Sequence, residues 1–130
     1  MGSKNNTVTF WPTYDLYFTA IISPNCTECT SDKGSYDIKG SKEDGFFEFL
    51  LGTGTEVFIL GSRDPTRPKI YIHGRWGMEY VSLKNESLLN ATYGRSSRQK
   101  ILIIEKAETE VNGVNTSYTF ETVGILGLSS

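Results

Sequence analysis

Short runs in which every second residue is apolar recur along this chain, and they constrain its fold more than any other feature. Side chains alternate between the two faces of a strand, so such a run buries one face of a strand. The first run places four apolar side chains on a single face: Leu16, Phe18, Ala20 and Ile22. Further runs cover residues 46–51, 57–60, 70–73, 80–83, 101–104 and 117–123. The pattern predicts an all-β chain with about eight or nine strands.

Turn-forming residues separate these runs at intervals of about eight to twelve positions. Asn112-Gly113 is the strongest hairpin signal, because both residues tolerate the positive φ of a tight type I′ turn. It predicts a hairpin that joins a strand at residues 108–111 to one at residues 115–120. Residues 64–68 contain two prolines and are therefore expected in a turn or at a sheet edge.

The number of short strands favours an antiparallel β-sandwich of immunoglobulin-like or jelly-roll type, with a barrel as second choice. The length of 130 residues fits one domain, so residues 1–130 are interpreted as a single β-sandwich domain, with residues 1–6 as a flexible or cloning-derived N-terminus. Residues 83–91 could form one or two turns of helix. The runs at residues 46–51 and 101–104 are apolar on both faces, which favours central burial over contact with another chain.

The charge balance narrows the classes of partner. The net charge is −2 and acidic and basic residues are interspersed, so no nucleic-acid partner is expected. No apolar run approaches the ~20 residues of a membrane-spanning helix, so this segment is not expected to insert into a membrane.

Asparagine acceptor sites are unusually dense. Five of the seven asparagines stand in Asn-X-Ser/Thr sequons, namely Asn5, Asn25, Asn85, Asn90 and Asn115. With 27 serines and threonines in 130 residues, chance predicts only about 1.5 such sequons. Acceptor sequons are typical of exposed segments in exported proteins, so the chain is expected outside the cytoplasm. The alternative is accidental accumulation in a chain rich in serine and threonine.

The two cysteines, Cys26 and Cys29, have three competing interpretations. A redox pair normally opens a helix, whereas here the flanking residues predict a loop. A zinc site needs four ligands, and His73 is the only histidine. A local disulfide that closes a loop in an oxidising compartment is the favoured interpretation, and two free thiols remain the alternative.

No residues stand in the pattern of a catalytic site. His73 would have to serve any histidine-based mechanism, yet no Gly-X-Ser-X-Gly motif accompanies it. Gly52-Thr53-Gly54 is too short for a phosphate loop and is interpreted as a hairpin turn. The chain is therefore expected to be no enzyme and to need no cofactor. A pair of carboxylates that meet in space, as in glycoside hydrolases, remains a lesser hypothesis.

No metal site is expected either, since no calcium loop of the Asp-X-Asp-X-Asp-Gly type is present. Four aspartates in or near predicted loops are the weaker alternative for a calcium site: Asp32, Asp37, Asp44 and Asp64.

Gly74-Arg75-Trp76-Gly77 is the segment that most resembles a binding site, because two glycines flank a cation and a large ring. An exposed tryptophan on a turn can stack on a sugar or anchor a protein interface. The alternative is a bend in which Trp76 caps the core. The candidate binding residues are Trp76, Arg75, His73, Tyr71 and Tyr80.

These observations favour a non-enzymatic, extracytoplasmic glycoprotein domain, either secreted or the ectodomain of an anchored surface protein. Its expected partner is another protein of the cell surface or envelope, or a further copy of itself. The alternative is a carbohydrate-binding, lectin-like module that uses the Trp/Arg segment.

Overall fold

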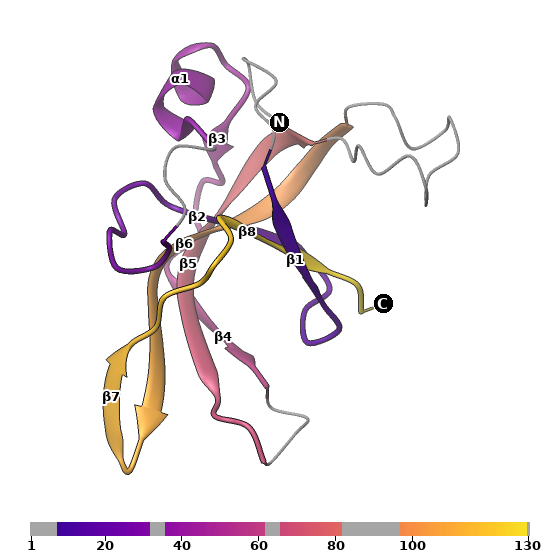
Figure 1. Ribbon diagram of the computed structural model, residues 1–130. Coiled ribbons are helices and arrows are strands. Elements are labelled where there is room, and N and C mark those ends of the chain that lie inside the picture. The colour runs from indigo at the N-terminus through magenta and orange to yellow at the C-terminus, as the bar shows by residue number, and fades with distance from the viewer. Residues whose placement is uncertain (1–7, 32–35, 62–65, 82–96, 130) are drawn as a thin grey trace.

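The computed structural model describes residues 8–31, 36–61, 66–81 and 97–129 (Figure 1). Most of them are in strands, which confirms the prediction of an all-β chain. In chain order the elements are β1 (Phe10–Thr13), β2 (Thr19–Ile22), α1 (Ile38–Glu43), β3 (Glu48–Phe49), β4 (Glu56–Leu60), β5 (Ile70–Val81), β6 (Ser97–Val111), β7 (Val114–Ser117) and β8 (Gly124–Gly127). The predicted helix at residues 83–91 lies outside the described residues.

The described strands form one open, mixed sheet rather than two packed sheets. Its main path runs β1-β8-β2-β6-β5-β3, while β4 pairs with β5 and β7 pairs with β6. The β1–β8 and β2–β6 pairs are parallel and the other pairs are antiparallel. The predicted sandwich type and the barrel are therefore not confirmed.

Two long strands explain the difference. β5 has 12 residues and β6 has 15, and they run antiparallel along almost their whole length. The sequence pattern had suggested separate strands at residues 70–73 and 80–83, with a break at Gly74 and Gly77. Both glycines instead lie inside β5. Figure 1 shows β5 and β6 crossing the molecule, with β4 and β7 at one end and α1 with β3 at the other.

The sheet buries apolar side chains on both faces. The larger core contains the predicted face of residues 16–22, the disulfide-bonded Cys29, and residues of β4, β5, β6 and the C-terminal region. Its members are Leu16, Phe18, Ala20, Ile22, Cys29, Leu60, Ile72, Trp76, Leu102, Ile104, Ala107, Phe120 and Ile125. The smaller core, on the opposite face, consists of Ile21, Tyr36, Phe47, Val81, Ile101 and Ile103. The single sheet thus has an apolar core on each of its two faces, whereas the expected sandwich would have one core between two sheets.

Two strand predictions had different outcomes. Residues 101–104 are central as expected, because β6 lies between β2 and β5 and all four side chains are at most 1% exposed. The run at residues 46–51 is not a central strand. Only Glu48–Phe49 pairs there, at the outer edge of β5, and Leu51 is 98% exposed although Phe47 is buried.

The β6–β7 hairpin and the helix α1 each follow from their local sequence. The Asn112-Gly113 hairpin is confirmed between β6 and β7, with φ values of 52° and 79°. The short helix α1 begins after Asp37, whose carboxylate accepts a hydrogen bond from the Gly40 amide at 2.9 Å.

No helix among the described residues has the length and apolarity required to cross a bilayer.

Candidate functional site

The five predicted binding residues all lie on β5, but the sheet separates them. Because side chains alternate along a strand, Trp76 and Tyr80 point to one face, and Tyr71, His73 and Arg75 point to the other. The segment around Trp76 is strand and not an exposed turn. The structure therefore does not bring Trp76 and Arg75 together.

Trp76 belongs to the larger core. It is 5% exposed, and its ring contacts Phe18 and Phe58 edge-on at centroid distances of 4.9 and 5.7 Å. Its indole N–H donates a hydrogen bond to Glu56 Oε2 at 2.5 Å. Gly74 instead permits the close approach of β5 to β6, because a β-carbon there would lie 2.5 Å from the Ile103 carbonyl oxygen.

Arg75 is engaged on the opposite face. Its Nε donates to Glu105 Oε1 at 2.6 Å, and its guanidinium lies 4.0 Å from the centroid of the Phe49 ring. The ion pair and the cation–π contact hold this cation against β3. Arg75 is thus already partnered within the fold.

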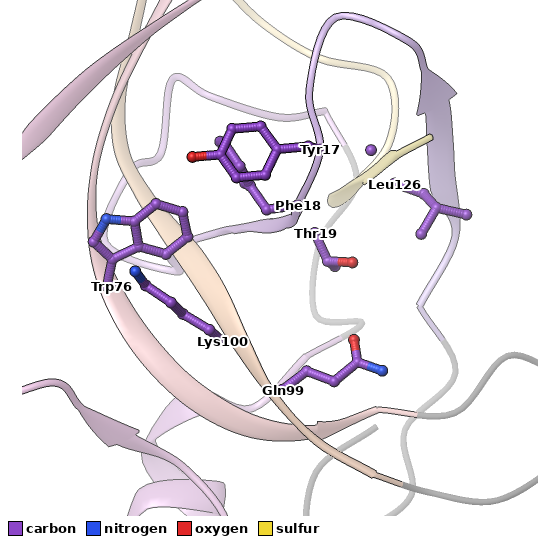
Figure 2. A pocket seen from close by; sticks show the side chains of 8 residues that line it. Tyr17, Phe18, Thr19, Trp76, Gln99, Lys100 and Leu126 are labelled. Carbon is purple, nitrogen blue, oxygen red and sulfur yellow. The ribbon is translucent and has the colours of Figure 1, made fainter. Parts of the chain in front are cut away.

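A groove of about 420 Å³ opens beside Trp76, where the start of β2 meets β5, β6 and the end of β8 (Figure 2). Its lining consists of Tyr17, Phe18, Thr19, Trp76, Gln99, Lys100, Leu126 and Gly127. No carboxylate is among these lining residues. Figure 2 shows the Trp76 and Lys100 side chains next to each other at one end of the groove and Leu126 at the other.

The groove contains two groups that the sequence analysis did not select. Tyr17 is 69% exposed, in keeping with its position between the buried Leu16 and Phe18 in an alternating run. The Lys100 ammonium lies over the Trp76 ring, 4.2 Å from its centroid. Within the described part of the chain, no carboxylate forms an ion pair with Lys100. The alternating pattern of β6 places Lys100 on the same face as Leu102, which is the signal that could have linked it to Trp76.

Tyr71 and His73 form a second surface with two exposed apolar residues of β4. Val57 pairs with His73 and Ile59 pairs with Tyr71, so the four side chains share one face, named here the β4 patch. Val57 is 52% exposed and Ile59 39%. Their outward orientation leaves Phe58 and Leu60 to pack into the larger core.

A charged pair borders the β4 patch on β6. Lys106 Nζ lies 2.6 Å from Glu108 Oε1, and His73 Nε2 lies 3.8 Å from the same oxygen. The hydrogen bond from Lys106, against a smaller opposing effect of burial, lowers the pKa of Glu108 below its ordinary value. This carboxylate therefore stays ionised at neutral pH, so the border of the β4 patch carries an ion pair between Lys106 and Glu108.

A buried polar pair lies under α1. Glu79 is fully buried and accepts hydrogen bonds from the Tyr36 hydroxyl at 2.5 Å and from the Tyr80 amide at 2.6 Å. Burial, followed by the hydrogen bond to Glu79, raises the pKa of Tyr36 well above its ordinary value. Tyr36 lies in the smaller core just before α1, so its hydrogen bond to Glu79 joins the segment that leads into α1 to β5.

The cysteines form the expected disulfide, Cys26–Cys29, with a Cα–Cα distance of 5.4 Å. Cys29 is in the larger core, and its carbonyl oxygen accepts a hydrogen bond from the Phe120 amide at 2.7 Å. The disulfide loop therefore covers one side of that core.

Two of the predicted acceptor asparagines can be placed. Asn25 is exposed directly before the Cys26–Cys29 disulfide, and Asn115 is exposed on β7. Asn5, Asn85 and Asn90 lie outside the described residues.

Among the residues that the structure describes, no group of three or more histidine, cysteine, aspartate or glutamate side chains gathers as a metal centre requires. Asp37 instead caps α1 and Asp44 follows its last turn, whereas Asp32 and Asp64 lie outside the described residues.

Comparison of the chain with protein-family models, curated proteins and solved structures finds no match.

Proposed function

We propose that this chain is a non-enzymatic, extracytoplasmic glycoprotein domain that binds another protein of the cell surface or assembles with further copies of itself. The observation that carries the proposal is the β4 patch on an outer strand of the sheet. In this proposal the single open sheet, with a core on each face, takes the place of the predicted β-sandwich and presents β4 to the partner.

Unprotected sheet edges attract other strands, and most outer strands of this sheet carry a feature that prevents such pairing. β1 contains Pro12, which lacks an amide hydrogen, and β3 has only two residues. β7 carries the Asn115 sequon, where a glycan would block approach. β4 has five residues without proline, lysine or a sequon, and its only partner among the described residues is β5. β4 is therefore the edge best suited to a protein partner.

The location outside the cytoplasm is supported by the disulfide and by the exposure of two acceptor asparagines. The Cys26–Cys29 disulfide is the oxidised form that persists in oxidising compartments. Asn25 and Asn115 are exposed, as an acceptor asparagine must be to carry a glycan.

A matched pair of charge substitutions tests the protein-binding role. Val57→Lys places a cation in the β4 patch, and Val114→Lys places one at an apolar position on β7 that is at least as exposed. Size-exclusion chromatography with light scattering and capture from the native cell envelope should show an association that Val57→Lys weakens at least about tenfold and Val114→Lys leaves intact. A chain that stays monomeric and captures nothing, or a Val57→Lys variant that binds like the wild type, contradicts the proposal.

The groove beside Trp76 supports carbohydrate binding as the second candidate function. It combines an exposed tyrosine ring with hydroxyl and ammonium groups, and its size suits a small ligand. Because Trp76 is buried, the exposed stacking surface is Tyr17 and not Trp76 as the sequence suggested. Tyr17→Ala should abolish binding to a glycan array without unfolding the protein, and a wild-type protein that binds no glycan refutes this candidate.

A further inference from the structure

The Lys100 ammonium is the feature of the groove that selects its ligand. The lining has this one basic side chain whose charge has no carboxylate partner among the described residues, and it has no acidic side chain. A ligand that brings its own negative charge would complete an ion pair there. A neutral polar ligand can accept a hydrogen bond from the ammonium, but it leaves the positive charge without a counter-charge.

Trp76 fixes where that charge lies. The indole is held by its hydrogen bond to Glu56 and by the edge-on contact with Phe18. The ammonium rests over this immobile ring at 4.2 Å, so the cation is partly ordered before a ligand arrives. Trp76 therefore acts as a positioning residue for Lys100.

Tyr17 supplies the surface for the rest of the ligand. Tyr17 is 69% exposed, and its ring lies edge-on against Phe18 at a centroid distance of 5.0 Å. An exposed aromatic face complements the C–H face of a pyranose ring, and its hydroxyl can bond to a ring hydroxyl. Leu126 provides an apolar wall at the far end of the groove.

We infer that the groove binds a saccharide with a carboxylate group, stacked on Tyr17 and paired through its carboxylate with Lys100. A volume of about 420 Å³ is sufficient for one or two sugar rings. The inference rests on the carbohydrate-binding candidate and adds the charge of the sugar to it.

Two sugars that differ only at C6 test the inference. Methyl β-D-glucuronide carries a carboxylate where methyl β-D-glucoside carries a hydroxymethyl group. In titrations followed by the backbone amide NMR signals of Tyr17 and Lys100, the glucuronide should bind about three- to tenfold more tightly than the glucoside. Raising the salt concentration should reduce that difference.

Lys100→Gln should remove the preference for the glucuronide, because it deletes the charge and keeps most of the side chain. Lys39→Gln makes the same charge change on an exposed position of α1 and should leave the preference unchanged. Equal binding of both sugars by the wild type would overturn the carboxylate inference while carbohydrate binding stands. Binding of neither sugar would overturn both, and shifts at Lys100 only with a blocked diglutamate peptide would assign the groove to acidic peptides instead.

Discussion

Gly77 is the position at which the packing of β5 against the smaller core can be tested most sharply. A β-carbon at this position would lie 2.6 Å from Phe47 Cζ and 2.9 Å from the Glu48 carbonyl oxygen. Phe47 is 1% exposed and cannot swing into solvent without leaving the core, and the carbonyl belongs to a strand that pairs with β5. Gly77→Ala must therefore displace a buried ring or a backbone segment.

The expected cost follows from two opposing effects. Overpacking of a filled core costs about 1–3 kcal/mol. Replacement of glycine recovers about 0.5–1 kcal/mol, because the unfolded chain loses conformational freedom. The net loss in the free energy of unfolding should be about 1–2 kcal/mol, which corresponds to a fall in Tm of about 4–7 °C for a chain of this length.

Urea denaturation followed by circular dichroism measures this loss. Gly54→Ala is the matched control, because a β-carbon there meets nothing within 4 Å. Its effect should stay within about 0.5 kcal/mol. Phe47→Leu introduced together with Gly77→Ala should restore part of the loss, as a positive coupling in a double-mutant cycle. A Gly77→Ala variant as stable as the wild type would refute the close packing of β5 on Phe47.

Three further changes probe other parts of the structure. Because the pKa of Tyr36 is raised, the folded state keeps a proton that the unfolded state loses above about pH 10, so the free energy of unfolding should fall there by up to about 1.4 kcal/mol per pH unit. Urea melts between pH 9 and 11 should show that Tyr36→Phe lacks this added slope, and an unchanged slope contradicts the prediction. Replacement of Cys26 and Cys29 together by alanine should lower the free energy of unfolding by no more than about 2 kcal/mol, because the loop that the disulfide closes is short. A larger loss in denaturant melts would show that the disulfide does more than close this loop. Gly113→Ala should cost about 1 kcal/mol at a φ of 79°, and a neutral result would be inconsistent with the tight hairpin turn.

The sequence predicts the secondary structure of this chain better than its architecture. Alternation in residues 16–22 correctly groups the side chains that enter the larger core, although the opposite face of β2 is buried as well. Asn112-Gly113 correctly identifies its hairpin, because a tight turn depends on local chemistry. The length of β5 was missed, since Gly74 and Gly77 look like breaks. Glycine is needed at these two positions because Ile103 and Phe47 approach them closely, and this contact between distant residues leaves no local pattern in the sequence.

The candidate sites were missed for the same reason. Trp76 and Arg75 are adjacent in sequence, but the strand sends them to opposite faces. Tyr17 and Lys100 are far apart in sequence and meet only because β2 pairs with β6 in parallel. Helix α1 was also overlooked, although Asp37 is a favoured N-cap residue, because six helical residues are too few to produce a clear period.

The claim that this is an exterior, sugar-bearing domain can be tested by one measurement on protein isolated from its native host. Peptide mapping by mass spectrometry should find glycan on Asn25 and Asn115, whose side chains face solvent. Unmodified asparagine at both positions in the native protein would contradict the account.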